Sequence, residues 1–461
     1  MSSHPEIARP ELTRLEVIKR ALPLVLANAT VPLAGVVDTF VLGLSGDKSD
    51  LGGVALGGAI FSVFYWSFYF LRMGTTGLTA QADGANDRAE TQRILIRAAA
   101  IAALLGIAVW LLRHPIAWGG FALLQGEAGV EAKGADYLLA RAWGAPAALA
   151  TFALTGWLIG LGRNSATLAI YAVFSGINIG LDLWFVLGLG YGPGGVGAAT
   201  AIAEWAGFLV GLGFVGHTLM RQGGWASGVR NRASLLDRHA IAQMFNVNIN
   251  LMIRTWSLVI GFTWFANAGA RQGTAILAGN HVLLQVITLW AFVLDAFAFV
   301  AETEAGRAYG RRSLDGLRRA VRLTGEPMFA AGAIFAVLTW LFGAQLLSLL
   351  IEDAEARAAA IRYLPWCAIV PFLGAGAWLM DGVFIGTTSG KILRNAGLAS
   401  LLVYLIADAL LATPLGNHGV WLAFLIFYIA RGGTLVLAYP SLERRLQSTP
   451  TASATEAKPS A

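Results

Sequence analysis

Long apolar stretches alternate with short charged or Gly/Pro-rich breaks along almost the whole chain, from Leu22 to Pro440. Each stretch holds roughly 20 residues, the length that an α-helix needs to cross about 30 Å of hydrocarbon. The pattern predicts an all-α membrane protein with twelve transmembrane helices. The predicted spans are 22–44, 53–79, 94–112, 137–161, 166–189, 195–219, 240–268, 275–303, 322–348, 362–387, 394–414 and 419–440.

Other architectures do not fit this pattern. A transmembrane β-barrel requires strands that alternate apolar and polar residues, and runs such as LVIGFTWFANAG do not alternate. The composition is 56% hydrophobic and only 13% charged, so a single soluble core cannot bury the apolar surface. The first residues carry mixed charges without a cleavable signal pattern, so we expect the first helix to remain as an anchor.

The basic residues indicate the orientation of the chain. Starting with the N-terminus inside, most of the 33 Lys and Arg residues fall in inner loops and tails, which is the positive-inside pattern. We therefore expect a multi-pass protein of the plasma membrane, or of a cell inner membrane, with both termini cytoplasmic and no nucleic-acid partner. One basic cluster follows this rule and consists of Arg307, Arg311, Arg312, Arg318, Arg319 and Arg322.

A weak internal repeat divides the spans into six plus six. GWLIG (156–160) resembles GVFIG (382–386), and Asp182 falls on Asp408 at the same offset. Such repeats commonly place a transport site between the two halves. The predicted organisation is an N-terminal tail (1–15), an N-lobe (16–220), a cytoplasmic linker (221–239), a C-lobe (240–440) and a disordered tail (441–461).

Three acids in the N-lobe are predicted to lie at a similar depth in the membrane. They are Asp38, Asp182 and Glu204. Intramembrane acids are costly and normally face a partner or a wet cavity. Asn178 and Thr200 each precede an acid by four residues, which places them on the same helix face. The cluster could bind a proton or Na⁺, or each acid could merely hydrogen-bond to backbone or balance an arginine.

The C-lobe carries buried charges of both signs, for which we expect structural roles. Three arginines are assigned to spans, namely Arg72 in the N-lobe and Arg254 and Arg431 in the C-lobe. The acids predicted to lie deep in the membrane are Asp295, Asp381 and Asp408. We expect Asp295 to pair with Arg254. Glu302 and Glu304 lie near the inner end and are expected to be solvated or paired with Arg307.

Three motifs stand out along the predicted helices. They are PLAGVVDTFVLGLSG in the first helix, NIGLDLWFVLGLGYGPGGVGAAT around the fifth, and NINLMIRT in the seventh. These motifs resemble the MATE (multidrug and toxin extrusion) family of transporters, and most closely its DinF branch. The resemblance implies a V-shaped pair of bundles around a central cavity. It also implies export of amphipathic, often cationic, compounds by antiport against a cation.

The resemblance assigns cation coupling to Asp38, Asn178, Asp182 and Thr200, with Tyr137 bordering the site. We add Glu204 as an accessory group from its depth. The seventh helix offers asparagines and Arg254 where sodium-coupled NorM-like members carry an acid, which favours H⁺ over Na⁺. No metal or other cofactor is expected, apart from Na⁺ if that is the coupling ion.

Two prolines in the first helix, Pro23 and Pro32, permit a bend that closes the N-lobe cavity when the acids are protonated. The chamber wall is assigned to aromatic and thioether side chains, although a lipid-facing or core position is also compatible with them. These residues are Phe64, Phe68, Met252 and Met380.

Two other functional classes remain as alternatives. A lipid-linked precursor flippase can share this architecture, but it needs a cavity dominated by cations. A membrane enzyme needs a catalytic constellation, and the six histidines are scattered. We therefore expect a transporter, acting as a monomer on small molecules, and no enzyme activity.

Overall fold

A computed structural model describes residues 12–45, 48–227, 229 and 231–448 of the chain. Within these residues every regular element is a helix, and twelve helical segments are long and apolar enough to cross a membrane. The predicted fold class and number of spans are confirmed.

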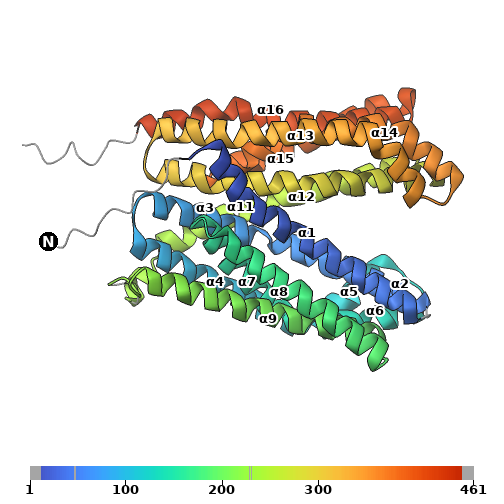
Figure 1. Ribbon diagram of the computed structural model, residues 1–461, viewed down its shortest axis with the longest axis horizontal. Helices are drawn as coiled ribbons and strands as arrows, with labels where there is room; N and C mark the ends of the chain where they lie inside the picture. The colour runs from blue at the N-terminus through green and yellow to red at the C-terminus, as the bar shows by residue number, and fades with distance from the viewer. Residues whose placement is uncertain (1–11, 46–47, 228, 230, 449–461) are drawn as a thin grey trace, which may run out of the picture.

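The first half of the chain forms one bundle of helices (Figure 1), which we call the first bundle. Its elements are α1 (Arg14–Ser45), α2 (Lys48–Phe68), α3 (Phe70–Gly84), α4 (Arg88–Leu111), α5 (Arg113–Leu124), α6 (Ala128–Arg141), η1 (Ala142–Gly144), α7 (Ala145–Gly160), α8 (Asn164–Asp182), η2 (Leu183–Gly188) and α9 (Gly192–Arg221). Within it, α2 packs on α6, α4 on α7, and α8 on both α1 and α9.

The second half forms the other layer in Figure 1, which we call the second bundle. After the short α10 (Arg232–Leu235) come α11 (Arg238–Ala270), α12 (Thr274–Gly310), α13 (Leu314–Leu350), α14 (Ala354–Gly386), α15 (Gly390–Leu415) and α16 (Asn417–Ser448). Here α14 packs on α12, α13 and α16, while α15 packs on α11 and α16.

Some elements differ from the predicted spans. The second span is broken at Tyr69 into α2 and α3, and the fourth is made of α6, η1 and α7. The sequence analysis did not predict α5, which lies between the third and fourth spans. Its 12 residues are too few to cross a bilayer.

The two bundles meet mainly through α3 and α12. Glycines allow the close approach, because a Cβ on Gly84 or Gly310 would overlap with the backbone of the opposing helix. The largest buried cluster also crosses this contact, and includes Leu71 of α3 and Val300 of α12.

Ion pairs reinforce the contact between the bundles. Arg307 of α12 donates to Asp83 of α3 at 2.8 Å and to Glu304 at 2.8 Å, and Glu304 also accepts from Arg20 of α1 at 2.7 Å. We call these four residues the inter-bundle cluster. The bundles are thus joined at the end where α3 and α12 finish.

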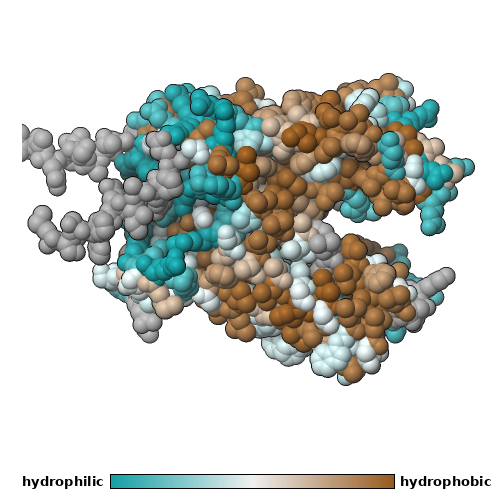
Figure 2. All heavy atoms as spheres, in the orientation of Figure 1, coloured by the Kyte–Doolittle hydropathy of each residue, from teal (hydrophilic) through white to brown (hydrophobic). Residues whose placement is uncertain are grey.

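The opposite end of the molecule is open. Figure 2 shows a hollow between the two bundles at the end away from the end of α16. In the same view the surface is apolar along most of the length and polar at both ends, as expected for a protein that spans a membrane.

Candidate functional site

The predicted site begins on α8, where Asn178 and Asp182 share one face. Asn178 Nδ2 donates to Asp182 Oδ2 at 2.8 Å, and the two side chains are 1% and 0% exposed. Because residues four apart face the same way on a helix, the pair is fixed by local structure alone. The same Asn178 Nδ2 lies 3.4 Å from Thr200 Oγ1 on α9.

Asp182 lies where the α-helix gives way to a wider turn. The six-residue π-helix η2 begins directly after it, at Leu183. Single π-turns inside transmembrane helices are frequent at functional sites because they re-aim nearby side chains and leave backbone groups less regularly bonded. The structure therefore places a distorted turn beside the buried acid.

Asp38 reaches this site from α1. Its half-buried carboxyl group lies beside that of Asp182. The neighbouring Val41 and Leu42 pack against Tyr137, Val186 and Val196 and so hold this part of α1 against the rest of the first bundle. Two ionised carboxylates can only accept hydrogen bonds and repel each other, so a proton shared between them would stabilise this arrangement.

Glu204 of α9 lies one turn after Thr200, which Asn178 contacts. It is 3% exposed, and the Tyr65 hydroxyl of α2 donates to its Oε1 at 3.5 Å. A Cβ on Gly144 would overlap with Oε2 of Glu204, so the glycine gives this acid its space. Of the three acids predicted to lie at one depth, Asp38 and Asp182 lie side by side, whereas Glu204 contacts Tyr65 instead.

Arg141 is a buried charged residue near this site that the sequence analysis missed. It donates to the Tyr137 hydroxyl, one turn earlier on α6, and its guanidinium lies 4.2 Å from the Phe61 ring centroid. It is within electrostatic range of Asp38, Asp182 and Glu204. Its position inside the predicted span 137–161, four residues after Tyr137, was the available signal.

Three carboxylate oxygens in this group are buried without a hydrogen-bond partner in the described part of the chain. They are Asp38 Oδ1, Asp182 Oδ1 and Glu204 Oε2. Unpartnered buried carboxylate oxygens are costly and are the places where a proton or a cation is stabilised. The site can therefore bind a positive species in addition to Arg141.

The buried acids of the second bundle are mostly neutralised by arginines. Asp381 contacts Arg254 and lies 3.2 Å from Arg431. Asp408 accepts from Arg271 at 2.7 Å and from Trp264 at 2.9 Å. These contacts agree with the structural roles expected for the second half of the chain.

Two ion pairs that the sequence analysis predicted in this region are wrong. Glu302 pairs with Arg72 at 3.3 Å rather than with Arg307, because its side chain faces Arg72 of α3 and lies only two residues before Glu304 of the inter-bundle cluster. Arg254 pairs with Asp381 of α14 rather than with Asp295, which lies within electrostatic range but outside the salt-bridge distance. Glu304 does pair with Arg307, as expected.

The residues assigned to the bend and to the chamber wall have the following positions. Pro23 and Pro32 both lie inside α1. Phe64 packs among residues of α2, α5 and α6, and Phe68 contacts Phe70 at 6.2 Å between ring centroids. The methionines, Met252 and Met380, pack in the large cluster that spans the second bundle and part of the first.

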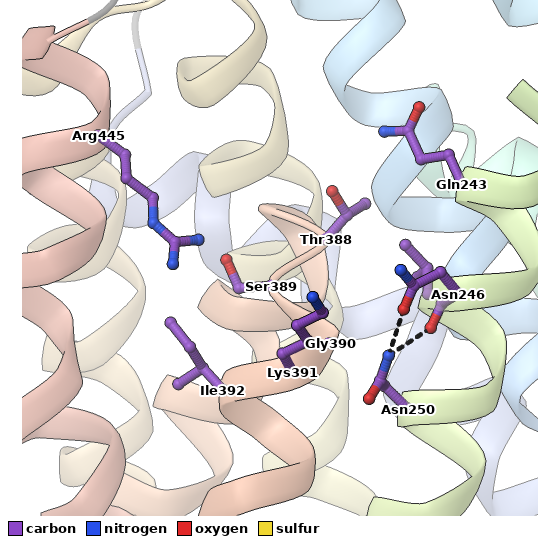
Figure 3. A pocket seen from close by; sticks show the side chains of 10 residues that line it. Gln243, Asn246, Asn250, Thr388, Ser389, Gly390, Lys391, Ile392 and Arg445 are labelled. Carbon is purple, nitrogen blue, oxygen red and sulfur yellow. Dashed lines mark hydrogen bonds between the residues drawn. The ribbon is translucent and has the colours of Figure 1, made fainter. Parts of the chain in front are cut away.

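A separate cavity of about 200 Å³ lies between α11, α15 and the end of α16 (Figure 3). Its wall includes Asn246 and Asn250, and Asn250 Nδ2 donates to Asn246 Oδ1 at 2.7 Å. None of the predicted coupling residues lines this cavity. Across the described residues, no group of three or more His, Cys, Asp or Glu side chains has the arrangement of a metal site.

Comparison with known proteins gives consistent matches over nearly the whole chain. The MatE family model matches residues 23–184 and 250–410. DNA damage-inducible protein F (DinF) of Escherichia coli is 37% identical over 420 residues, covering 90% of this chain and 89% of that protein. A probable multidrug resistance protein NorM of Bradyrhizobium diazoefficiens is 26% identical over 463 residues, covering 94% of each chain. A crystal structure of MATE in the bent conformation has a TM-score of 0.85 at 18% identity, covering 95% of this chain and 97% of that one.

Proposed function

Because the chain belongs to the MATE family of multidrug and toxin extrusion transporters, we propose that it exports amphipathic, often cationic, compounds in exchange for protons carried by Asp38 and Asp182. Members of this family are transporters and not enzymes, and they use cation gradients. The choice of the proton, the residues that carry it and the substrate class are our proposal.

The contact between Asp38 and Asp182 is the observation that carries the proposal. One proton satisfies this contact, and a second would satisfy an oxygen that has no partner. Asn178 donates to Asp182 on α8 and also to Thr200 of α9, which links the carboxyl group of Asp182 to the neighbouring helix. A change in protonation here therefore changes how α1 is attached to α8.

The charges of the second bundle support the proton over Na⁺. Asp381 is shared by Arg254 and Arg431, so the two guanidinium groups already occupy the place of a cation. A further cation would meet two positive charges in a poorly screened environment. The same pairing, together with Arg72 and Glu302, disfavours a lipid-linked precursor flippase, because each of these arginines is already paired with an acid of the protein.

The transport cycle follows from the position of α1. We place both termini in the cytoplasm, so that the hollow in Figure 2 opens to the outside. Protons that enter this hollow neutralise Asp38 and Asp182. The pocket then no longer needs water to solvate these acids, and α1 bends near Pro23 and Pro32 and expels the substrate. The proton acts by binding one conformation better than the other, which limits the coupling energy to that difference.

Reconstituted protein tests the proposal. Efflux of ethidium from proteoliposomes is measured with a pH gradient and, separately, with a sodium gradient. We expect the pH gradient alone to drive efflux, and we expect Asp38→Asn and Asp182→Asn to bind ethidium but to lose the response. Asp136→Asn removes an exposed acid of α6 and serves as the matched control. Efflux at the wild-type rate by either site variant would contradict the proposal.

A further inference from the structure

The cavity in the second bundle has the composition of an anion site. It occupies about 200 Å³ between α11, α15 and the end of α16 (Figure 3). A water molecule takes about 30 Å³ in the liquid, so the cavity has room for a polyatomic group. Two of its lining residues, Lys391 and Arg445, are positively charged, and its described lining residues include no acid. Lys391 pairs with no acid in the described part of the chain. The cavity therefore favours a negatively charged ligand.

The N-terminus of α15 forms one wall of this cavity. Ser389 is the N-cap residue, but its side chain makes no capping hydrogen bond. Among the described residues, Ile392 is the first of this helix whose N–H group has a backbone acceptor, the Ser389 carbonyl, so the N–H groups of Gly390 and Lys391 are left without one. Such N–H groups, at the positive end of the helix dipole, bind the oxygens of phosphate and other anions.

A buried amide of α11 forms the opposite wall. Asn250 is 3% exposed, and its Nδ2 donates to the carbonyl oxygen of Asn246 at 2.6 Å and to Asn246 Oδ1 at 2.7 Å. Its Oδ1 has no hydrogen-bond partner among the described residues. In Figure 3 the side chain projects from α11 toward α15, and a Cβ on Gly390 would lie 3.0 Å from that of Asn250. An unpartnered buried oxygen is costly, so this amide points to a ligand that supplies a hydrogen-bond donor.

We propose that the cavity binds a phosphate group on a molecule that also carries a hydroxyl group. Lys391, Arg445 and the first N–H groups of α15 hold the phosphate oxygens, and the hydroxyl group donates to Asn250 Oδ1. The phosphoglycerol headgroup of an anionic lipid has this chemistry, and so does inorganic phosphate that retains a proton. None of the predicted coupling residues lines the cavity, so the proposal does not rest on the proposed function.

The position of the cavity suits a phosphate at the level of the lipid headgroups. The cavity lies near the beginnings of α11 and α15 and near the end of α16, and the surface at this end of the molecule is polar (Figure 2). Basic pockets between membrane helices at this level bind the headgroups of anionic lipids.

Binding is measured on the purified full chain in a neutral detergent. The probes are dioctanoyl phosphatidylglycerol, dioctanoyl phosphatidylcholine and, at constant ionic strength, ³²P-labelled inorganic phosphate. Native mass spectrometry follows the lipids and equilibrium dialysis follows the phosphate. We expect saturable binding of phosphatidylglycerol, with a rise in the thermal unfolding midpoint, and none of phosphatidylcholine, whose headgroup has no net negative charge and no hydroxyl group. Saturable binding of inorganic phosphate instead would support the same site with a free anion as its ligand.

Two variants test whether the ligand occupies this cavity. Lys391→Gln removes a positive charge, and Asn246→Asp adds a negative one while keeping the acceptor for Asn250 Nδ2. Each changes an exposed residue, so we expect both to fold and to weaken binding by at least about tenfold. Lys19→Gln and Asn267→Asp are the matched controls, because they make the same changes at exposed positions outside the cavity.

Two results would overturn the proposal. One is that the wild type binds neither phosphate nor phosphatidylglycerol saturably, or binds phosphatidylcholine as tightly as phosphatidylglycerol. The other is that folded Lys391→Gln and Asn246→Asp bind the ligand as tightly as the wild type and the two controls. Because the readout is binding, its failure leaves the proposed exchange of protons untouched.

Discussion

The inter-bundle cluster allows a quantitative prediction about the fraction of molecules in which the two bundles are joined at the α3–α12 contact. Asp83→Asn removes the charge that Arg307 meets across the bundle contact, while Glu304 stays in place. The side chains of Asp83, Arg307 and Glu304 are only 12%, 8% and 10% exposed, so water screens the lost interaction weakly. A hydrogen bond between charged groups in such a setting contributes about 2 kcal/mol.

That free energy converts into a change in population. About 2 kcal/mol corresponds to a factor of about 30 between the form joined at this end and the form separated there. If the separated form is about 1% of wild-type molecules, the variant is expected to hold about a quarter in that form. The effect arises because Asp83 pairs with Arg307 only while α3 and α12 are in contact.

The distance between spin labels on Ala85→Cys and Arg311→Cys measures this population, since both residues are exposed beside the contact. The native Cys367 is buried and stays unlabelled. Glu90→Gln is the control, because Glu90 pairs with arginines of its own helix. Identical distance distributions for Asp83→Asn and wild type would refute the reasoning.

Two further predictions concern single buried contacts. Gly144→Ala introduces a methyl group that overlaps with the carboxyl group of Glu204. It is expected to lower the free energy of unfolding by about 1–3 kcal/mol and to impair proton-driven efflux. Gly213→Ala is the control, because Gly213 has open space around it, and it is expected to change neither thermal unfolding nor efflux. Asp408→Asn is expected to lower the free energy of unfolding by about 2 kcal/mol, because it weakens the contact with Arg271. Efflux by the folded fraction of this variant is expected to be driven by the pH gradient, as in the wild type. An unchanged unfolding midpoint for Asp408→Asn, or a switch to sodium-driven efflux, would contradict the structural role of this acid.

The contents of the candidate site were partly visible in the sequence. Asn178 and Asp182 are four residues apart on one helix, so helical geometry alone brings them together. Glu204 and Asp38 could be placed at a similar depth by counting residues, but whether their helices are neighbours depends on packing. Arg141 lies inside the predicted span 137–161, but its contact with Tyr137 and its nearness to the acids of other helices depend on packing.

The sequence by itself determined that this protein is a bundle of twelve membrane helices, because the hydrocarbon thickness sets the length of each apolar stretch. It also determined which polar residues are forced into that bundle. Only the tertiary structure decided the pairing of charges. Glu302, for example, pairs with Arg72 of the first bundle rather than with Arg307, five residues later on its own helix. The physical reason is that membrane insertion depends on the hydropathy of each helix separately, whereas an ion pair depends on which faces of two helices pack together.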